Sequence, residues 1–462
     1  MTPLLRCLLV AAGYAAAGEL ARRRPSRSLV AWNESFWIGA ALFTAALVLG
    51  SSTKLPVLGV LFPILPAAIV AVVLRRAAGF SRRSGDRPLR SPGRGARLPL
   101  ALAFLSASVF VALDMRTGFV TDGFGIWASK ARVLAVEGRL DPADAMPQRL
   151  GRVVNYPPLV PLTEALIGRQ GRELDFPAAK LAFPAFFLSL LVGTWGLARR
   201  ALASERAAGW TVAIVALLPA VSTDWNAGGF ADLPMAAAVA AMAGAWLHAR
   251  EIRGEGAVPA WVAGAVILVK PEGIVLAASA VLAASLAGRA VPRRLRPAPW
   301  WVLAGFALVA LYWRKRYGME DGQYGPLDAA HWSVAAQRVG LVAGKAAVEM
   351  ASGKNWGLFW LVALPSAVLG SFAAREPVRS LARFVLVSAS ALTAIFLFSN
   401  WGFPGSGAYG AQSLSFHIAV ALPRLLEQIA APAALLVVAS YRAMGARGSP
   451  GAAENGAGSL AL

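Results

Sequence analysis

The residues best suited to chemistry in this chain are two aspartates that stand beside glycines at the edges of apolar stretches. Asp122 is the second residue of the segment TDGFGIWASKARVL, and Asp232 lies in GGFADLPM at the start of another apolar run. A carboxylate at the edge of an apolar region is partly desolvated, which raises its pKa toward the range of a general base. Each aspartate could instead cap the helix that follows it, where the helix dipole favours a negative charge.

Basic side chains that could neutralise an anion follow the same pattern. Lys130 falls on one helix face with Ile126, Trp127 and Leu134, because side chains three and four apart share a face. Its ammonium could snorkel to lipid headgroups or pair with a phosphate. Arg424 stands just before a late apolar stretch, where an arginine could equally anchor to headgroups.

Four further side chains complete the candidate set. Tyr156 precedes two prolines that predict the start of a helix, and the tyrosine fixed there could line a site. Lys270 and Glu272 stand two residues apart in VKPEG, so one could serve the other as counter-ion. His417 lies on the same helix face as Arg424, unless the intervening Pro423 interrupts that helix.

The elements that must position these residues are transmembrane helices. The chain is 57% hydrophobic and 15% charged with a mean hydropathy of +0.57, which lies outside ordinary soluble usage. We therefore expect an all-α fold, a polytopic helix bundle of about 13 spans, with amphipathic helices in a long outer segment at 116–175. The expected spans are 4–20, 36–52, 56–74, 98–115, 176–198, 208–221, 232–249, 257–269, 272–288, 299–313, 356–372, 381–398 and 425–441.

The basic residues gather in every second connection between these spans. The formal net charge is +21, and more than half of the 45 lysines and arginines lie on one side, above all in 75–97. The positive-inside rule makes that side cytoplasmic and places all the candidate residues outside. We therefore expect a multi-pass protein of the cytoplasmic membrane with an extracytoplasmic site. Because the charges form no single exposed surface, we expect no nucleic-acid partner.

Several common catalytic signatures are missing from the sequence. It contains no GxxxxGK[ST] loop and no HExxH motif, and it has only three histidines. The single cysteine, Cys7, lies in the first span, which excludes an internal disulfide. Glu320 and Asp321 could bind a divalent metal through their carboxylates, but nothing else in the sequence indicates a metal or a cofactor.

Taken in order, the polar motifs resemble those of a known class of enzyme. The series consists of DGFGIWASKARVL, YPPL, GFADLP, KPEG and a late outer arginine. It resembles the GT-C fold glycosyltransferases, and within them the bacterial polytopic relatives of protein mannosyltransferases and the lipid A aminoarabinose transferase. The similarity covers roughly residues 98–441.

The resemblance implies a polyprenyl phosphate monosaccharide as donor, an envelope glycan or lipid as acceptor, and contact with membrane lipids. It makes Asp122 the base that deprotonates the acceptor and Asp232 a group that orients acceptor or sugar. Lys130, Tyr156 and Arg424 would hold the carrier phosphate. The supporting residues would be Lys270, Glu272 and His417. Paired acidic residues of the protein mannosyltransferases' first loop are missing, which argues against a protein acceptor.

The resemblance also divides the chain. Residues 1–97 would form a three-span segment with a basic cytoplasmic loop, 98–441 the catalytic membrane module, and 442–462 a disordered cytoplasmic tail. Two other functions remain open at this point. A transporter or lipid flippase would carry charges near mid-span and inverted repeats of broken helices. A polysaccharide ligase or polymerase would use a diphosphate-linked donor.

Direct inverting attack needs few groups. A glycosyl phosphate is already activated, so the reaction needs a base for the acceptor and cations for the departing phosphate. One carboxylate opposite Lys or Arg would suffice, and the chemistry demands no metal.

Overall fold

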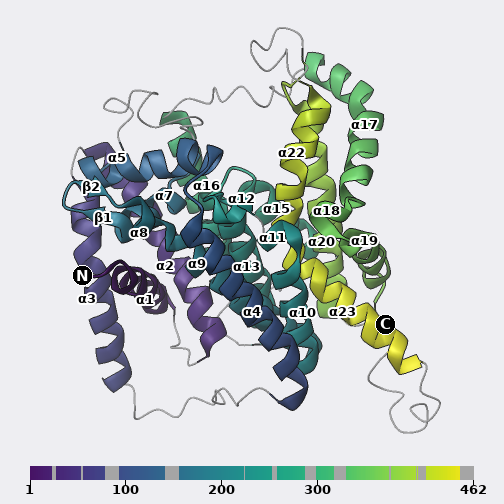
Figure 1. Ribbon diagram of the computed structural model, residues 1–462, viewed down its shortest axis with the longest axis horizontal. Helices are drawn as coiled ribbons and strands as arrows, with labels where there is room; N and C mark the ends of the chain where they lie inside the picture. Colours follow the sequence, from purple (N-terminus) through teal and green to yellow (C-terminus); the bar gives the residue numbers. More distant parts are fainter. Residues whose placement is uncertain are drawn as a thin grey trace.

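The structure is a computed structural model that describes residues 1–22, 28–53, 56–78, 93–140, 156–222, 224–251, 257–286, 298–316, 329–373, 376–401, 403 and 413–447. The described residues are mostly helical, which confirms the all-α class (Figure 1). The N-terminal elements are α1 (Pro3–Ala21), α2 (Leu29–Gly50), η1 (Ser51–Thr53), α3 (Val57–Ala78) and α4 (Arg94–Arg116). Small residues let α1 and α2 pack closely, since a Cβ on Gly18 would stand 1.9 Å from the backbone oxygen of Ser35.

A layer of short elements follows α4. The expected amphipathic helix begins as the π-helix η2 (Gly123–Ala128) and continues as α5 (Ser129–Glu137). The paired prolines start a helix as expected, because α7 (Leu159–Gly168) begins directly after Pro158. The remaining elements are β1 (Arg169–Gln170) and β2 (Glu173–Leu174), paired antiparallel, and α8 (Phe176–Lys180). Figure 1 shows this layer gathered at the upper left of the bundle.

The central helices form the apolar core. Its elements are α9 (Ala182–Leu202), α10 (Glu205–Leu217), α11 (Pro219–Ser222), α12 (Asp224–Ala227), α13 (Asp232–Glu251), α14 (Val258–Val269), α15 (Gly273–Leu286) and α16 (Ala298–Arg316). Helix α13 is rich in alanine, and its residues from Leu233 to Ala245 are buried on all sides. A helix that is apolar all round is buried in this way. Asp232 is the first residue of α13 and is therefore buried with the rest of this helix.

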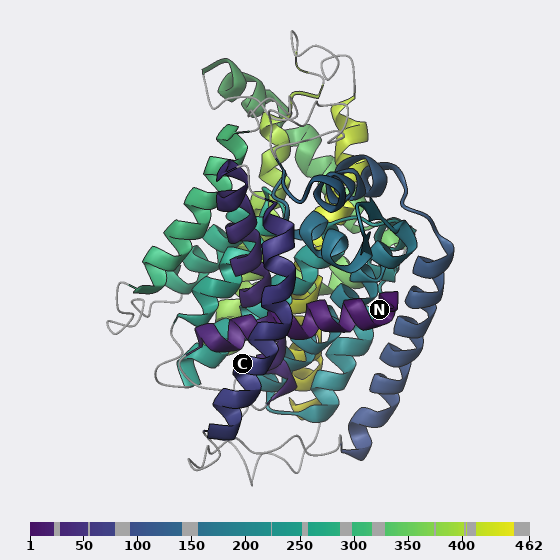
Figure 2. The ribbon, with the colours of Figure 1, turned by 90° about the vertical axis from the view of Figure 1, so that its left-hand side faces the viewer.

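The C-terminal helices stand along the opposite side of the bundle (Figures 1 and 2). They are α17 (Ala329–Met350), α18 (Gly353–Trp356), α19 (Phe359–Gly370), α20 (Glu376–Ala394), η3 (Ile395–Phe398), α22 (Leu414–Glu427) and α23 (Ala430–Arg447). Helix α22 continues through Pro423, and the chain bends by 66° between α22 and α23. Helix α23 continues past residue 442, where we expected the tail to begin.

Fewer helices than expected are long enough to cross a membrane. Within the described ranges, six helices have the length and hydropathy of spans, or seven if α22 and α23 count as one bent span. Five apolar helices are shorter, among them α14 and α15, which meet at the turn containing Lys270. A helix needs about 20 residues to span the hydrocarbon core. The bundle is thus multi-pass, and the number of 13 spans is not confirmed.

Candidate active site

Two loops that carry the aspartates lie against each other. The first leads from α4 to Asp122, and the second precedes Asp232. The amide of Val120 donates a hydrogen bond to the carbonyl oxygen of Gly228 at 3.1 Å. A Cβ on Gly123 would stand 2.0 Å from that same oxygen, so only glycine fits there. This close approach brings both carboxylates within reach of one cation.

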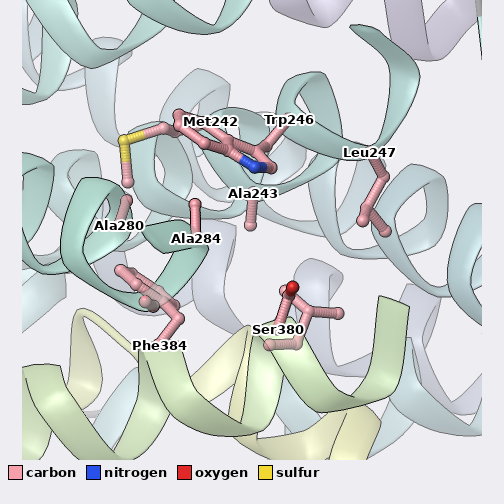
Figure 3. Close-up of a pocket in the computed structure, with 10 residues that line it drawn as sticks. Met242, Ala243, Trp246, Leu247, Ala280, Ala284, Ser380 and Phe384 are labelled. Atoms are coloured by element: carbon pink, nitrogen blue, oxygen red, sulfur yellow. The ribbon is translucent and has the colours of Figure 1, made fainter. Parts of the chain in front are cut away.

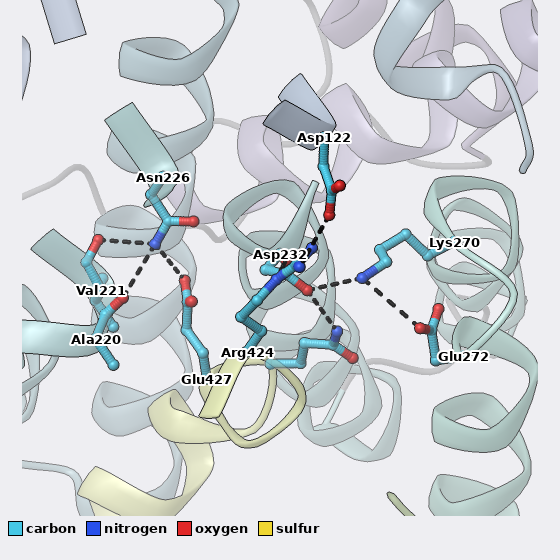
Figure 4. Close-up of polar contacts among 10 residues, drawn as sticks. Asp122, Ala220, Val221, Asn226, Asp232, Lys270, Glu272, Arg424 and Glu427 are labelled. Carbon is cyan, nitrogen blue, oxygen red and sulfur yellow. Dashed lines mark hydrogen bonds and ion pairs between the residues drawn. The ribbon is translucent and has the colours of Figure 1, made fainter. Parts of the chain in front are cut away.

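That cation is the guanidinium of Arg424 on α22 (Figure 4). Its Nε donates to Oδ2 of Asp232 at 2.8 Å, and its Nη1 donates to Oδ2 of Asp122 at 3.0 Å. Its Cζ also lies 4.3 Å from the ring centroid of Phe230. The planar, forked guanidinium suits such a bridge better than an ammonium does. Arg424 therefore joins both loops to a helix near the other end of the chain.

Asp232 is the centre of this cluster. Besides Arg424, its carboxylate accepts hydrogen bonds from Nζ of Lys270 at 2.8 Å and from Nε2 of Gln428 at 3.1 Å. Lys270 also lies 3.7 Å from Oε1 of Glu272. Burial lowers the pKa of the Lys270 ammonium, but the two carboxylates outweigh burial and raise that pKa above its ordinary value. Lys270 therefore stays charged.

The members of the cluster differ in their access to solvent. The side chain of Asp122 is 39% exposed and that of Arg424 is 19% exposed, whereas Asp232 and Lys270 are exposed by 1% and 5%. A ligand that reaches the cluster therefore meets Asp122 and Arg424 first. The buried Asp232 behind them holds Arg424 in place.

Asp122 does not act as the helix cap that we considered. Its carboxylate makes no capping hydrogen bond to η2 and is turned toward Arg424 instead. The preceding residue, Thr121, has a φ of 30°, which is unfavourable for a β-branched side chain. Strained residues of this kind persist only where the surroundings fix them, and they are common at functional sites.

Two buried residues next to the cluster were missed by the sequence analysis. Nδ2 of Asn226 donates to Oε1 of Glu427 at 2.7 Å and to the carbonyl oxygens of Ala220 and Val221 (Figure 4). These bonds fasten the segment before Asp232 to the end of α22. Glu427 is a single glutamate in the apolar run LLEQIAAPAALL, which is itself a signal, but nothing in the sequence pairs it with Asn226.

Lys130 and Tyr156 lie together in a second polar group. Lys130 is fully buried, as its apolar stripe predicts, and its Nζ lies 5.4 Å and 5.8 Å from the ring centroids of Trp127 and Tyr156. It therefore does not snorkel to a surface. Burial lowers the pKa of Lys130 to about 7, against the opposing effect of the Glu164 carboxylate. Glu164 was missed, although a single glutamate in the apolar run LVPLTEALIG is itself a signal.

His417 also lies outside the Asp122 cluster. Its Nδ1 is 2.9 Å from Oγ of Ser399, and its ring stacks on that of Trp401 with centroids 4.5 Å apart. The structure therefore brings together five of the predicted site residues in one cluster and two in another, with His417 apart. The five are Asp122, Asp232, Lys270, Glu272 and Arg424.

A small apolar cavity lies away from both groups (Figure 3). It has a volume of about 30 Å³ and lies between α13, α15 and α20, beside Trp246, Phe384 and Ser380. A space of this size holds about one water molecule. It does not fit a sugar or a lipid chain.

The described residues contain no group of three or more His, Cys, Asp and Glu side chains that could hold a metal ion. Glu320 and Asp321, the carboxylates that we considered for this role, lie outside the described residues.

No protein-family model matches the chain, and no curated protein matches its sequence. Among solved structures, the chain is similar to ArnT from Cupriavidus metallidurans in the apo state, with a TM-score of 0.49 and 17% identity over 75% of this chain and 59% of that one. It is also similar to that protein bound to undecaprenyl phosphate, with a TM-score of 0.49 and 19% identity over 76% of this chain and 63% of that one.

A third similar structure is the archaeal oligosaccharyltransferase AglB from Archaeoglobus fulgidus, in complex with an inhibitory peptide and a dolichol-phosphate. The TM-score is 0.43 and the identity 14%, over 79% of this chain and 53% of that one. ArnT and AglB are membrane glycosyltransferases of the GT-C fold, the class that the order of the motifs resembles. The matched region covers less than two thirds of each of these proteins.

Proposed function

We propose that this protein is an integral membrane glycosyltransferase. It moves a monosaccharide from a polyprenyl phosphate carrier to an envelope glycan or lipid on the extracytoplasmic side, by direct attack with inversion. One observation carries the proposal. The accessible carboxylate of Asp122 faces the guanidinium of Arg424, which is anchored from behind by the buried Asp232.

Asp122 is the base in this mechanism. The acceptor oxygen forms a bond to the anomeric carbon of the donor, and its proton passes to the Asp122 carboxylate. The bond between the anomeric carbon and the phosphate oxygen breaks, and its electron pair leaves with the phosphate. The leaving polyprenyl phosphate thus gains negative charge, which requires a cation at the place where the charge develops.

Arg424 is the accessible cation for that charge. In the described structure it is shared between two carboxylates, so a phosphate competes with Asp122 for the Nη1 donor. Binding of the donor therefore frees the Asp122 carboxylate for the acceptor. Asp232 keeps its bond to Nε and to Lys270, which makes it an anchor for the cations rather than a contact to the sugar.

The proposed mechanism assigns no step to Lys130 or Tyr156. Lys130 is buried next to Glu164, and its pKa near 7 leaves its ammonium only partly charged at neutral pH. A phosphate role for these two residues stays a prediction that separate variants must test.

The experiment is a donor screen on the purified protein in proteoliposomes, with synthetic short-chain polyprenyl phosphate sugars and mass spectrometry of the products. We expect covalent transfer from a monophosphate donor and a loss of about 10²-fold to 10⁴-fold in Asp122→Asn. The matched control is Asp175→Asn, which removes a carboxylate that caps α8 in the same outer segment.

Three results would contradict the proposal. Sugar transfer by Asp122→Asn at the parental rate would show that Asp122 is not the base. Transfer only from diphosphate donors indicates a ligase or polymerase. Uptake of a sugar or lipid without any covalent product indicates a transporter or flippase.

A further inference from the structure

Lys180, the last residue of α8, is a buried lysine that no step of the proposed reaction uses. Its Nζ donates to the carbonyl oxygen of Ala227 at 2.6 Å and to that of Thr117, and it lies 3.5 Å from Oδ1 of Asp114. An ammonium has three N–H donors and no acceptor. The two carbonyls take two of these donors, and the Asp114 carboxylate lies beside the ammonium as its ion-pair partner.

The two carbonyl groups belong to the two loops of the candidate active site. Thr117 follows α4 directly and precedes Asp122 by a few residues, and Ala227 ends α12 shortly before Asp232. One side chain thus binds the backbone of both loops.

Other contacts between the loops converge on the same place. Nζ of Lys180 lies 5.7 Å from the ring centroid of Phe119, and a Cβ on Gly229 would stand 2.5 Å from that ring. The amide of Val120, next to Phe119, donates to the carbonyl oxygen of Gly228, next to Gly229. The first loop also contains Thr121 with its strained φ of 30°, so it needs surroundings that hold it in this conformation.

We infer that Lys180 is a positioning residue, which sets the spacing between the Asp122 loop and the Asp232 loop so that Arg424 bridges both carboxylates. This inference rests on the proposed function for its effect on catalysis. Lys180 itself touches no substrate and no reacting atom. Its effect should therefore appear in kcat, while donor binding through Arg424 is largely retained.

The first test is a double variant that removes the charges of Lys180 and Asp114 together. Lys180→Met alone would leave Asp114 buried without its partner, which is costly. The double variant Lys180→Met with Asp114→Leu avoids this. We expect it to fold, with kcat lowered roughly tenfold to a hundredfold and the donor KM changed by less than about twofold.

A second readout does not depend on activity. Hydrogen exchange at the Val120 amide reports the contact between the loops, because this amide bonds to Gly228. We expect exchange to be faster by roughly tenfold or more in the double variant, with amides in α13 unchanged. The control is Arg22→Met, which removes a buried arginine 3.3 Å from Glu34 and leaves that carboxylate paired with Arg200 at 2.5 Å.

Lys180→Arg covers the case in which the double variant fails to fold. It keeps a positive charge for Asp114, but a planar guanidinium cannot match the three acceptors of an ammonium. We expect a folded protein with lowered kcat, an unchanged donor KM and faster Val120 exchange.

The results separate the two proposals. Parental Val120 exchange in a folded Lys180 variant overturns the inference, whatever the activity. Faster exchange with parental kcat also overturns it, because the loops are then loosened without consequence. If the parental protein transfers no sugar at all, the proposed function fails, and the exchange measurement still decides whether Lys180 ties the loops.

Discussion

Two buried lysines of this protein have opposite electrostatic surroundings. Lys270 has the Asp232 carboxylate at 2.8 Å and a raised pKa, whereas burial lowers the pKa of Lys130 to about 7 against the opposing effect of the Glu164 carboxylate. Glu164, the acidic neighbour of Lys130, has a pKa raised well above its ordinary value by burial, although Lys130 opposes the shift. A carboxylate at hydrogen-bond distance therefore keeps Lys270 charged despite its burial.

The difference separates the two groups by function. In the Asp122 cluster, Asp232, Lys270 and Arg424 keep their charges at any pH near neutrality. Because burial lowers the pKa of Lys130 to about 7, its charge and its electrostatic contribution change with pH near neutrality. Fixed charges suit phosphate chemistry, and the phosphate role of Lys130 stays a prediction.

The largest effect should come from removing the centre of the cluster. Asp232→Leu leaves Arg424 and Lys270 in the interior without their shared partner, and breaking a buried ion pair costs about 3–5 kcal/mol. We expect a large drop in the thermal unfolding midpoint in detergent, together with loss of sugar transfer. An unchanged midpoint would show that the cluster is more hydrated than its burial indicates.

A smaller effect should follow from Arg424→Lys. The variant keeps the charge, but one ammonium cannot reproduce the forked contact to Asp122 and Asp232. We expect transfer to fall by about 10²-fold with a midpoint close to the parental one. The opposite pattern, full activity with low stability, would make Arg424 purely structural.

Lys130→Met tests the pH-dependent pair. Because the pKa of Lys130 is lowered from 10.5 to about 7, the unfolded protein binds one more proton than the folded protein between these values. Stability from this group therefore rises as pH increases above 7. We expect the midpoint of the parental protein to rise relative to that of Lys130→Met between pH 7 and pH 9. A constant difference would mean that Lys130 stays charged.

The smallest effect is expected at Lys270. Its raised pKa lies above the unfolded value, so its contribution is fully present below pH 10 and is lost only at higher pH. Between pH 7 and pH 9, the difference in midpoint between the parental protein and Lys270→Met should stay constant. Comparison with Lys130→Met under identical conditions supplies the control for both variants.

Part of this site could be predicted from the sequence. Asp122, Asp232, Lys270 and Arg424 stand out because each is a charge at the end of an apolar stretch, where it needs a partner. Their partners could not be predicted. Arg424 contacts Asp122 across 302 positions, and only the packing of α22 against the loops creates that contact.

The neighbours of Lys130 show a different limit. Its face on the helix was correct, but its proximity to Asp122 in sequence suggested a shared site. The π-helix η2 has a wider turn than an α-helix, which changes the direction of the residues that follow. Lys130 is thereby placed against α7 and Glu164. Hydropathy alone likewise could not distinguish the short apolar helices from full spans.

The contact between Gly123 and Gly228 limits how this protein can vary. A single methyl group on Gly123 would stand 2.0 Å from a backbone oxygen, so the loops would have to separate by about 1 Å, and a displacement of this size can cost about 10²-fold in rate. Homologues that keep this catalytic arrangement should therefore retain glycine at position 123 for want of space. In an alignment of such homologues, an invariant glycine at position 123 would mark the proteins that share this contact between the loops.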